Sequence, residues 1–106
     1  MIVEYIRYRI PDNDRRAQFQ DAYKTAETFL EASPNCLGYE ISHCVEKPEH
    51  YIVRIEWDSL DGHLKGFRVS KEFQGFFERV KPFFNEIEEM QHYEVMTTTG
   101  TTQENR

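Results

Sequence analysis

Apolar and polar positions along the chain follow two periods, one of two residues and one of three to four. Residues 2–10, IVEYIRYRI, are rich in β-branched and aromatic side chains, which is typical of a strand. Pro11 and the polar run behind it end this strand. The following apolar positions predict a helix that is capped by Asp12 or Asp14 and ends near Ser33. Its apolar positions are Phe19, Ala22, Tyr23, Ala26, Phe29 and Leu30.

Two further strands are predicted in the middle of the chain. Residues 37–46 alternate and place Leu37, Tyr39, Ile41, His43 and Val45 on one face. The sequence EKPEH then turns the chain into residues 51–57, which alternate in the same way. A short connection of this kind joins antiparallel strands, so we expect the two runs to pair with each other.

After residue 57 the period changes to that of a helix. Asp58 or Ser59 is placed to cap a short helix. Its expected inner stripe consists of Leu60, His63, Leu64 and Phe67. Ser70 is placed to cap a second helical segment, which Pro82 kinks or restarts. Its apolar positions are Phe73, Phe76, Phe77 and Val80. Residues 90–98, MQHYEVMTT, supply the last predicted strand.

The resulting order βαββαβ predicts an α+β, ferredoxin-like fold, a four-stranded antiparallel sheet with helices on one face. In the usual strand order of such a sheet, 4-1-3-2, the second and fourth strands are the opposite edges. We expect residues 1–98 to form a single domain and the polar residues 99–106 to be a disordered tail.

The first strand is apolar on both of its sides, which leaves one sheet face without a cover. Ile2, Ile6, Tyr8 and Ile10 lie on one side, and Val3 and Tyr5 on the other. We therefore expect a homodimer through the open sheet face, which makes a dimeric α/β barrel. The charged strand residues Arg7, Arg9, Arg54 and Glu56 are then either polar insertions in the barrel interior or a solvated face.

Composition narrows the classes of partner. The 106 residues carry 13 basic and 19 acidic side chains, a net charge of −6, and no basic stripe, so nucleic acid is not an expected partner. No apolar run approaches the roughly 18 residues of a membrane span, and Met1 leads directly into a strand-like segment, which predicts a cytoplasmic protein. Cys36 and Cys44 form no C-x-x-C pair and are expected to be buried thiols.

Motifs for metal, nucleotide and acyl-enzyme chemistry are missing from the sequence. His43, His50 and His92 fall on a strand, in a turn and on another strand, without the spacing of metal ligands, so no metal site is expected. There is no glycine-rich phosphate loop and no G-x-S-x-G sequence.

Residues 36–77, CLGYEISHCVEKPEHYIVRIEWDSLDGHLKGFRVSKEFQGFF, resemble the antibiotic biosynthesis monooxygenase family, which includes quinol monooxygenases. The matching features are a GYE strand, a strand ending in EW, a DSLDGH helix start and an S-x-x-F-x-x-F continuation. The resemblance covers about residues 2–97. It implies a dimeric α/β barrel and, in some members, oxygenation of quinols or aromatic polyketides by O2 without metal or flavin.

Individual positions limit what the resemblance implies. Polyketide-oxidising members pair a Trp with an Asn four residues before it and a Tyr six residues after it. Here Trp57 matches the Trp, but Val53 and His63 stand at the other two positions. Haem-degrading members have a Trp and a His where this chain has Phe67 and Phe77, so haem cleavage of that type is not expected.

The candidate catalytic residue under this resemblance is His63. Cofactor-free oxygenation requires an electron-rich substrate that loses a proton, and a base with a pKa near neutrality suits that step. The alternative for His63 is a packed histidine bonded to a backbone carbonyl.

The other candidates are substrate-binding residues. Trp57 either stacks on a planar substrate or anchors the core, and Phe67 and Phe77, with Phe73 and Phe76, either line an apolar pocket or fill the core. Tyr5 and Arg7, with Glu56, either point into the barrel, where Arg7 would stabilise a substrate oxyanion, or form an Arg–Glu pair between strands.

Two functions remain open from the sequence. The first is a cofactor-independent monooxygenase that oxidises a small aromatic substrate of the quinol or anthrone type with O2, with no metal and no other cofactor. The second is a non-catalytic dimeric domain that binds a ligand or a partner protein, because this fold is used for many purposes and the Asn is missing.

Overall fold

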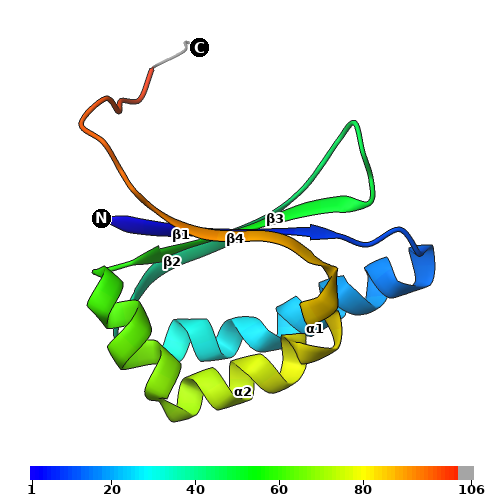
Figure 1. Cartoon of the computed structure of the whole chain (residues 1–106), viewed down its shortest axis with the longest axis horizontal. Helices are drawn as coiled ribbons and strands as arrows, with labels where there is room; N and C mark the ends of the chain where they lie inside the picture. The colour runs from blue at the N-terminus through cyan, green and yellow to red at the C-terminus, as the bar shows by residue number, and fades with distance from the viewer. Residues whose placement is uncertain (103–106) are drawn as a thin grey trace.

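The chain forms one four-stranded antiparallel sheet with its helices packed against a single face (Figure 1). The computed structural model describes residues 1–102. The strand order is β2-β3-β1-β4, so β2 and β4 are the edges, and the predicted α+β, ferredoxin-like fold is confirmed. The elements are β1 (Ile2–Arg9), α1 (Asn13–Ala32), β2 (Cys36–His43), β3 (His50–Trp57), a π-helical turn (Gly62–Gly66), a 3-10 turn (Phe67–Val69), α2 (Lys71–Val80), a second 3-10 turn (Lys81–Glu86) and β4 (Ile87–Glu94).

Capping residues predicted from the sequence begin both α1 and α2, and α1 ends at the predicted residue. The side chain of Asp12 accepts a hydrogen bond from the backbone N–H of Asp14 at 2.8 Å and caps α1. At the other end the N–H of Ser33 donates to the carbonyl of Leu30 at 3.1 Å. Ser70 caps α2 by accepting from the N–H of Phe73. Pro82 stands in the first turn of the second 3-10 segment, as its missing N–H favours.

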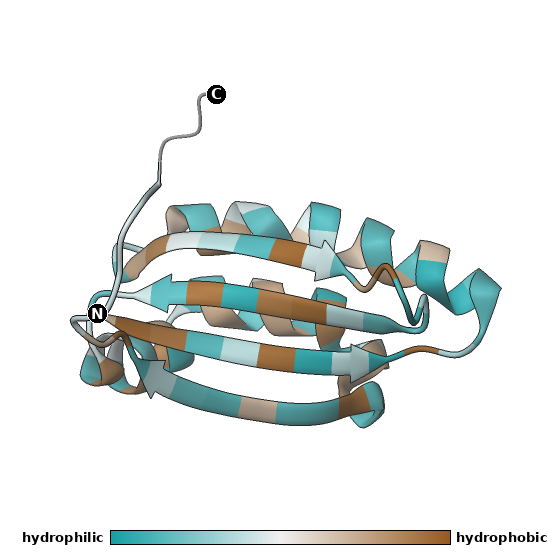
Figure 2. Cartoon of the chain, turned by 90° about the horizontal axis from the view of Figure 1, so that it is seen from above, coloured by the Kyte–Doolittle hydropathy of each residue, from teal (hydrophilic) through white to brown (hydrophobic). Residues whose placement is uncertain are grey.

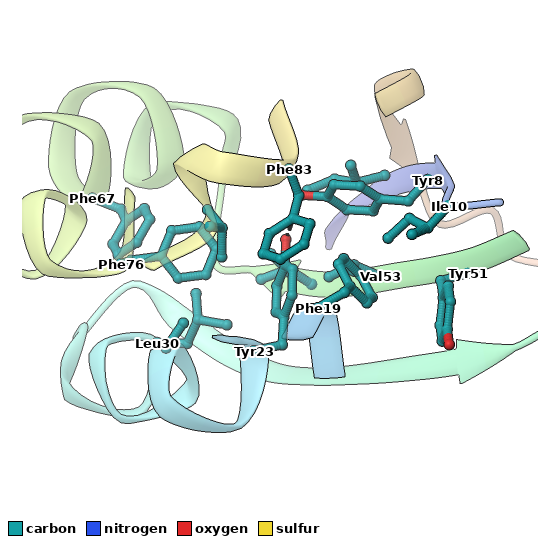
Figure 3. Packing of buried hydrophobic residues seen from close by; sticks show 14 of the residues in the cluster. Tyr8, Ile10, Phe19, Tyr23, Leu30, Tyr51, Val53, Phe67, Phe76 and Phe83 are labelled. Carbon is teal, nitrogen blue, oxygen red and sulfur yellow. Dashed lines mark hydrogen bonds between the residues drawn. The ribbon is translucent and has the colours of Figure 1, made fainter. Parts of the chain in front are cut away.

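The core lies between the sheet and the helices and is rich in aromatic rings (Figure 3). Every second residue of β3 is buried against the helices, from Tyr51 to Trp57. Phe19 of α1 contacts Tyr8, Tyr23 and Tyr51 with ring centroids 4.7, 5.1 and 4.8 Å apart. The hydroxyls of Tyr8 and Tyr23 form a buried hydrogen bond of 2.7 Å, which satisfies both polar groups in the apolar layer.

Two predicted strand boundaries are wrong. β2 ends at His43 rather than residue 46, because the N–H of Cys44 already bonds the carbonyl of His50 and closes the hairpin, leaving Val45 89% exposed. β4 begins at Ile87, which pairs with Tyr8, and it ends at Glu94 rather than residue 98. Tyr39, Ile41 and His43 share one side of β2, as predicted, and pair with the helix-facing residues of β3. Ile41 and His43 are nevertheless exposed at this edge of the sheet.

The segment after β3 differs from the single regular helix that the sequence predicts. A π-helical turn and a 3-10 turn replace it, and their residues per turn differ from 3.6 in opposite directions. The expected inner stripe is therefore only half correct. His63 and Phe67 are buried, whereas Leu60 is 43% and Leu64 39% exposed.

The face of the sheet that carries no helix, here called the open face, mixes polar and apolar side chains. Figure 2 shows the sheet in front of the helices, with hydrophilic and hydrophobic residues interspersed along its strands. The open face is formed by Val3, Tyr5, Arg7 and Arg9 of β1, Glu40 and Ser42 of β2, Ile52, Arg54 and Glu56 of β3, and Glu89, Gln91 and Tyr93 of β4. A single chain therefore has an open sheet and not a closed barrel. Arg54 forms an ion pair with Glu56 and donates to the Tyr5 hydroxyl at 3.2 Å.

The cysteines, the helices and the C-terminal residues each bear on a smaller expectation. Cys36 and Cys44 are free thiols, as predicted, but both are partly exposed rather than buried. Among residues 1–102, no helix is long and apolar enough to cross a membrane. Residues 99–102 form no helix or strand, and the rest of the predicted disordered tail, 103–106, lies outside the described residues.

Candidate functional site

The turn that carries His63 is held tightly against the end of β3. Ser59 caps it, because its hydroxyl oxygen accepts the N–H of Gly62 at 2.9 Å. Two glycines allow the turn to approach its neighbours closely: a Cβ at Gly62 would lie 1.8 Å from Oδ1 of Asp58, and one at Gly66 would lie 2.4 Å from Oδ1 of Asn35. This close packing fixes the position from which the His63 side chain enters the space between sheet and helices.

His63 belongs to a buried cluster drawn from four elements. Its ring stacks on Trp57 of β3, with centroids 4.3 Å apart and planes 9° apart. Its Nδ1 lies 2.6 Å from Nε2 of His92 on β4, and its Nε2 lies 3.6 Å from Oε1 of Glu4 on β1. The same Glu4 oxygen accepts the indole N–H of Trp57 at 3.1 Å. His63 therefore does not bond a backbone carbonyl, which was the structural alternative for this residue.

Burial controls the protonation of this cluster. Desolvation, followed by the positive charge of Arg68 and by His92, lowers the pKa of His63 to about 3. Burial and Arg68 also lower the pKa of His92. Burial raises the pKa of Glu4, although the hydrogen bond from Trp57 and the charge of Arg68 act in the opposite direction. The expectation of a near-neutral pKa for His63 is therefore wrong, because the sequence does not reveal its burial.

A cavity of about 190 Å³ lies beside the cluster, between the sheet and α2. Four of the predicted site residues line it together: Trp57, His63, Phe67 and Phe77. Glu4 and the exposed Arg68 complete its polar wall. The walls are otherwise apolar, which suits a small planar ligand whose few polar atoms meet one carboxyl, one imidazole and one guanidinium.

Tyr5 and Arg7 are not part of this site. They occupy alternate positions to Glu4 along β1 and point to the open face, where Tyr5 contacts Tyr93 at 5.4 Å between ring centroids and Arg7 pairs with Glu88 at 3.5 Å. Arg7 is therefore not the cavity's guanidinium. His63 and Trp57, by contrast, face the helices of their own chain.

Three cavity or cluster residues were missed by sequence reasoning. Glu4 shares a strand side with Ile6 and Tyr8, so its position on the helix-covered face was readable from the alternation. Arg68 follows Phe67 directly but is turned toward the cavity by the irregular 3-10 segment. His92 is 29 residues from His63, and only the pairing of β4 with β1 brings the two rings together.

A second depression, of about 410 Å³, lies between α1 and β2. Part of its ionisable lining is already engaged, since Lys24 pairs with Glu27 at 3.0 Å and Glu27 also accepts the Tyr39 hydroxyl at 2.6 Å. His43 stacks on Tyr51 there, with ring centroids 4.2 Å apart. This groove is larger than the cavity beside His63, but it gathers no comparable cluster of buried ionisable groups.

Fold and cavity together define a small ferredoxin-like protein with a ligand-sized space between its sheet and helices. Residues 1–79 match the model of the family described as "Antibiotic biosynthesis monooxygenase", and the chain belongs to that family. A curated relative is the uncharacterized protein YczJ of Bacillus subtilis (strain 168), 26% identical over 77 residues, which cover 73% of this chain and 81% of YczJ.

Solved structures share the fold at low identity. A candidate antibiotic biosynthesis monooxygenase from Bordetella bronchiseptica superposes with a TM-score of 0.72 at 23% identity, covering 90% of this chain and 96% of that one. A variant of SnoaB, a cofactor-independent oxygenase from Streptomyces nogalater, superposes with a TM-score of 0.70 at 12% identity, covering 96% and 97%. At these identities the likeness establishes the architecture alone.

Proposed function

We propose that this protein oxidises a small hydroquinone with O2 as the only co-reactant, inside the cavity beside His63. The observation that carries the proposal is the buried, neutral imidazole of His63 on the wall of an aromatic cavity, with Arg68 on the same wall. Membership of the monooxygenase family and the likeness to a cofactor-independent oxygenase support it.

The size of the cavity favours the smaller of the expected substrates. Pockets for drug-sized ligands have volumes of about 300–1,000 Å³. A space of about 190 Å³ is below that range. A single aromatic ring with two hydroxyls is therefore a better substrate than a three-ring anthrone, and the faces of Phe67 and Phe77 supply apolar contacts for such a ring.

The reaction balances without an external reductant. One hydroquinone and one O2 give one hydroxybenzoquinone and one water. One oxygen atom forms a new bond to a ring carbon, and the other leaves as water with two substrate hydrogens. The substrate supplies every electron, so the step needs only its deprotonation and a place for O2.

The cluster provides a route for the first proton. If Nδ1–H of His63 donates to Nε2 of His92, the Nε2 lone pair of His63 is available to a substrate hydroxyl. Because its pKa is low, His63 does not retain the substrate proton and instead transfers a proton to His92. The partly exposed His92 can then release a proton to solvent. Arg68 stabilises the phenolate that remains, since a fixed positive charge favours a developing anion.

We also propose that two copies associate through the open face. Tyr5 and Tyr93 leave 36% and 46% of their surface exposed there, and no helix of the described residues covers them. Sedimentation at micromolar concentration should give twice the chain mass of 12.7 kDa, and a value of 12.7 kDa would contradict the dimer. The cytoplasmic location inferred from the sequence stays a prediction.

The function is tested by oxygen consumption with purified protein. Monocyclic hydroquinones and an anthrone are compared, with product identified by mass. The proposal expects one O2 used for each quinol and a product one oxygen atom heavier and two hydrogens lighter. Binding of the same compounds with no O2 uptake above the protein-free rate would instead favour the non-catalytic binding domain. The buried Val53, at the position where polyketide-oxidising members carry an Asn, also favours that alternative.

A further inference from the structure

The side chains of Glu4, His63 and His92 bring one carboxylate oxygen and two imidazole nitrogens within 4.8 Å of one another. Glu4 and His63 are only 3% and 2% exposed, and His92 lies partly exposed at the edge of the cluster. We propose that these three side chains form a binding site for a divalent transition-metal ion of the Zn²⁺ type.

The spacing suits such an ion. Ligand atoms about 2.1 Å from a tetrahedral zinc ion lie about 3.4 Å from one another. Nε2 of His63 and Oε1 of Glu4 are 3.6 Å apart, close to this value. The widest separation, at most 4.8 Å, exceeds the tetrahedral spacing by roughly 1.4 Å, and His92, the least enclosed member, is the side chain that can rotate to close it. The three ligands come from β1, the π-helical turn and β4, which the packed sheet holds in place.

Neighbouring groups already orient two of the ligands. The indole N–H of Trp57 donates to Glu4 at 3.1 Å, and the indole ring stacks on His63. Contacts of this kind outside the ligands fix ring and carboxylate orientation in metal sites, and their loss typically lowers affinity about 10–100-fold. One of the three ligands, His63, is carried by a π-helical turn, a feature that occurs often at functional positions.

The donor set selects the kind of cation. Two imidazoles and one carboxylate suit zinc and its transition-metal neighbours, whereas Mg²⁺ and Ca²⁺ prefer oxygen ligands. Three protein ligands leave a coordination position open, as in catalytic zinc sites, and the adjoining cavity provides space for a water or a small ligand there. The positive Arg68 on the same wall opposes the metal, so removing its charge should tighten binding.

Metal binding does not rest on the proposed oxidation. It is measured on the resting protein, and it stands or falls whether or not a hydroquinone is turned over. The two are related only in that a bound ion would take the imidazole lone pairs that the proton route uses. Zinc is therefore expected to inhibit oxygen uptake, if that activity is found.

The test is a titration of untagged, chelator-stripped protein with Zn²⁺ against a coloured zinc chelator, repeated with Co²⁺, Mg²⁺ and Ca²⁺. We expect one Zn²⁺ per chain, an absorption band of four- or five-coordinate Co²⁺, and no binding of Mg²⁺ or Ca²⁺ at the same concentrations. His92→Ala should weaken Zn²⁺ binding by at least about tenfold, because removing even a residue that only orients a metal ligand typically lowers metal affinity about 10–100-fold.

Controls keep the result interpretable. His43→Ala and His50→Ala remove histidines outside the cluster and should leave Zn²⁺ affinity unchanged, whereas Arg68→Gln should increase it. Glu4→Gln and His63→Gln lie in the buried part and could unfold the chain, so the partly exposed His92 is the deciding position. Less than a fifth of an equivalent of bound Zn²⁺, or equal affinity in wild type and His92→Ala, would overturn the proposal.

Discussion

The two faces of the sheet both carry ionisable and aromatic residues, but these residues are hydrated on one face and buried on the other. On the open face, Arg54 pairs with Glu56 and binds the Tyr5 hydroxyl, and all three side chains keep contact with water. On the helix-covered face, Glu4 and His63 are almost fully buried and their pKa values are shifted in opposite directions. Paired charges in water need no further partner, whereas buried ionisable groups beside a cavity are typical of a functional site.

The largest expected difference between the faces concerns stability. Trp57 is fully buried and contacts both His63 and Phe67, so Trp57→Ala should lower the free energy of unfolding by about 3–5 kcal/mol. Tyr93→Ala on the open face, where the ring is 46% exposed, should cost about 1 kcal/mol or less. Urea unfolding of both variants measures the two losses of free energy of unfolding. Equal losses would show that the two faces do not differ in their contribution to stability.

The next largest expected difference between the faces concerns the rate of O2 uptake. His63→Gln should lower hydroquinone-dependent O2 uptake by on the order of a hundredfold, because the acceptor for the substrate proton is lost. Arg7→Gln changes a side chain that points away from the cavity, and its turnover should equal that of wild type. Initial rates measured with an oxygen electrode, on variants with native circular dichroism, test both expectations. Full activity in His63→Gln would show that His63 has only a structural role.

A smaller contrast is expected from removing one hydroxyl on each face. Tyr23→Phe leaves the buried Tyr8 hydroxyl without its partner and should cost about 1–3 kcal/mol. Tyr5→Phe deletes a hydroxyl that bonds Arg54 near water, and in the dissociated chain the cost should be within about 0.5 kcal/mol. Thermal and urea unfolding report both values, and a larger loss for Tyr5→Phe than for Tyr23→Phe in the dissociated chain would contradict the comparison.

The smallest effect is expected for the open-face ion pair. In the dissociated chain, a double-mutant cycle on Arg54→Ala and Glu56→Ala should give a coupling energy of about 0–1 kcal/mol, because both side chains are partly hydrated. At concentrations where the proposed dimer forms, the coupling energy should be larger, because a second copy excludes water from the pair. The cycle therefore sharpens the dimer proposal as well as the comparison of the faces.

The fold could be predicted because its signals are local. The alternation in β1 and β3, the spacing of three and four in α1, and the caps at Asp12 and Ser70 each depend on a few neighbouring residues. The boundaries of β2 and β4 could not, because hairpin closure and the pairing of Ile87 with Tyr8 are set by contacts distant in sequence.

The site could be predicted only in part. The family resemblance pairs Trp57 with His63, and the aromatic positions Phe67 and Phe77 are candidates for an apolar pocket; the structure brings all four to one cavity. Tyr5 and Arg7 lie on the open face, where the barrel interpretation placed them, and so outside the cavity beside His63; their binding role stays a prediction. His92 and Arg68 join the site through strand pairing and an irregular turn, which leave no periodic pattern in the sequence.

The most direct test of the account is a crystal structure with a monocyclic hydroquinone bound, soaked under anaerobic conditions so that the substrate persists. The ring is expected between the sheet and α2, against Trp57 and Phe67, with one hydroxyl within hydrogen-bonding distance of Nε2 of His63. A ring bound on the open face beside Tyr5 and Arg7, with the cavity empty, would contradict the account.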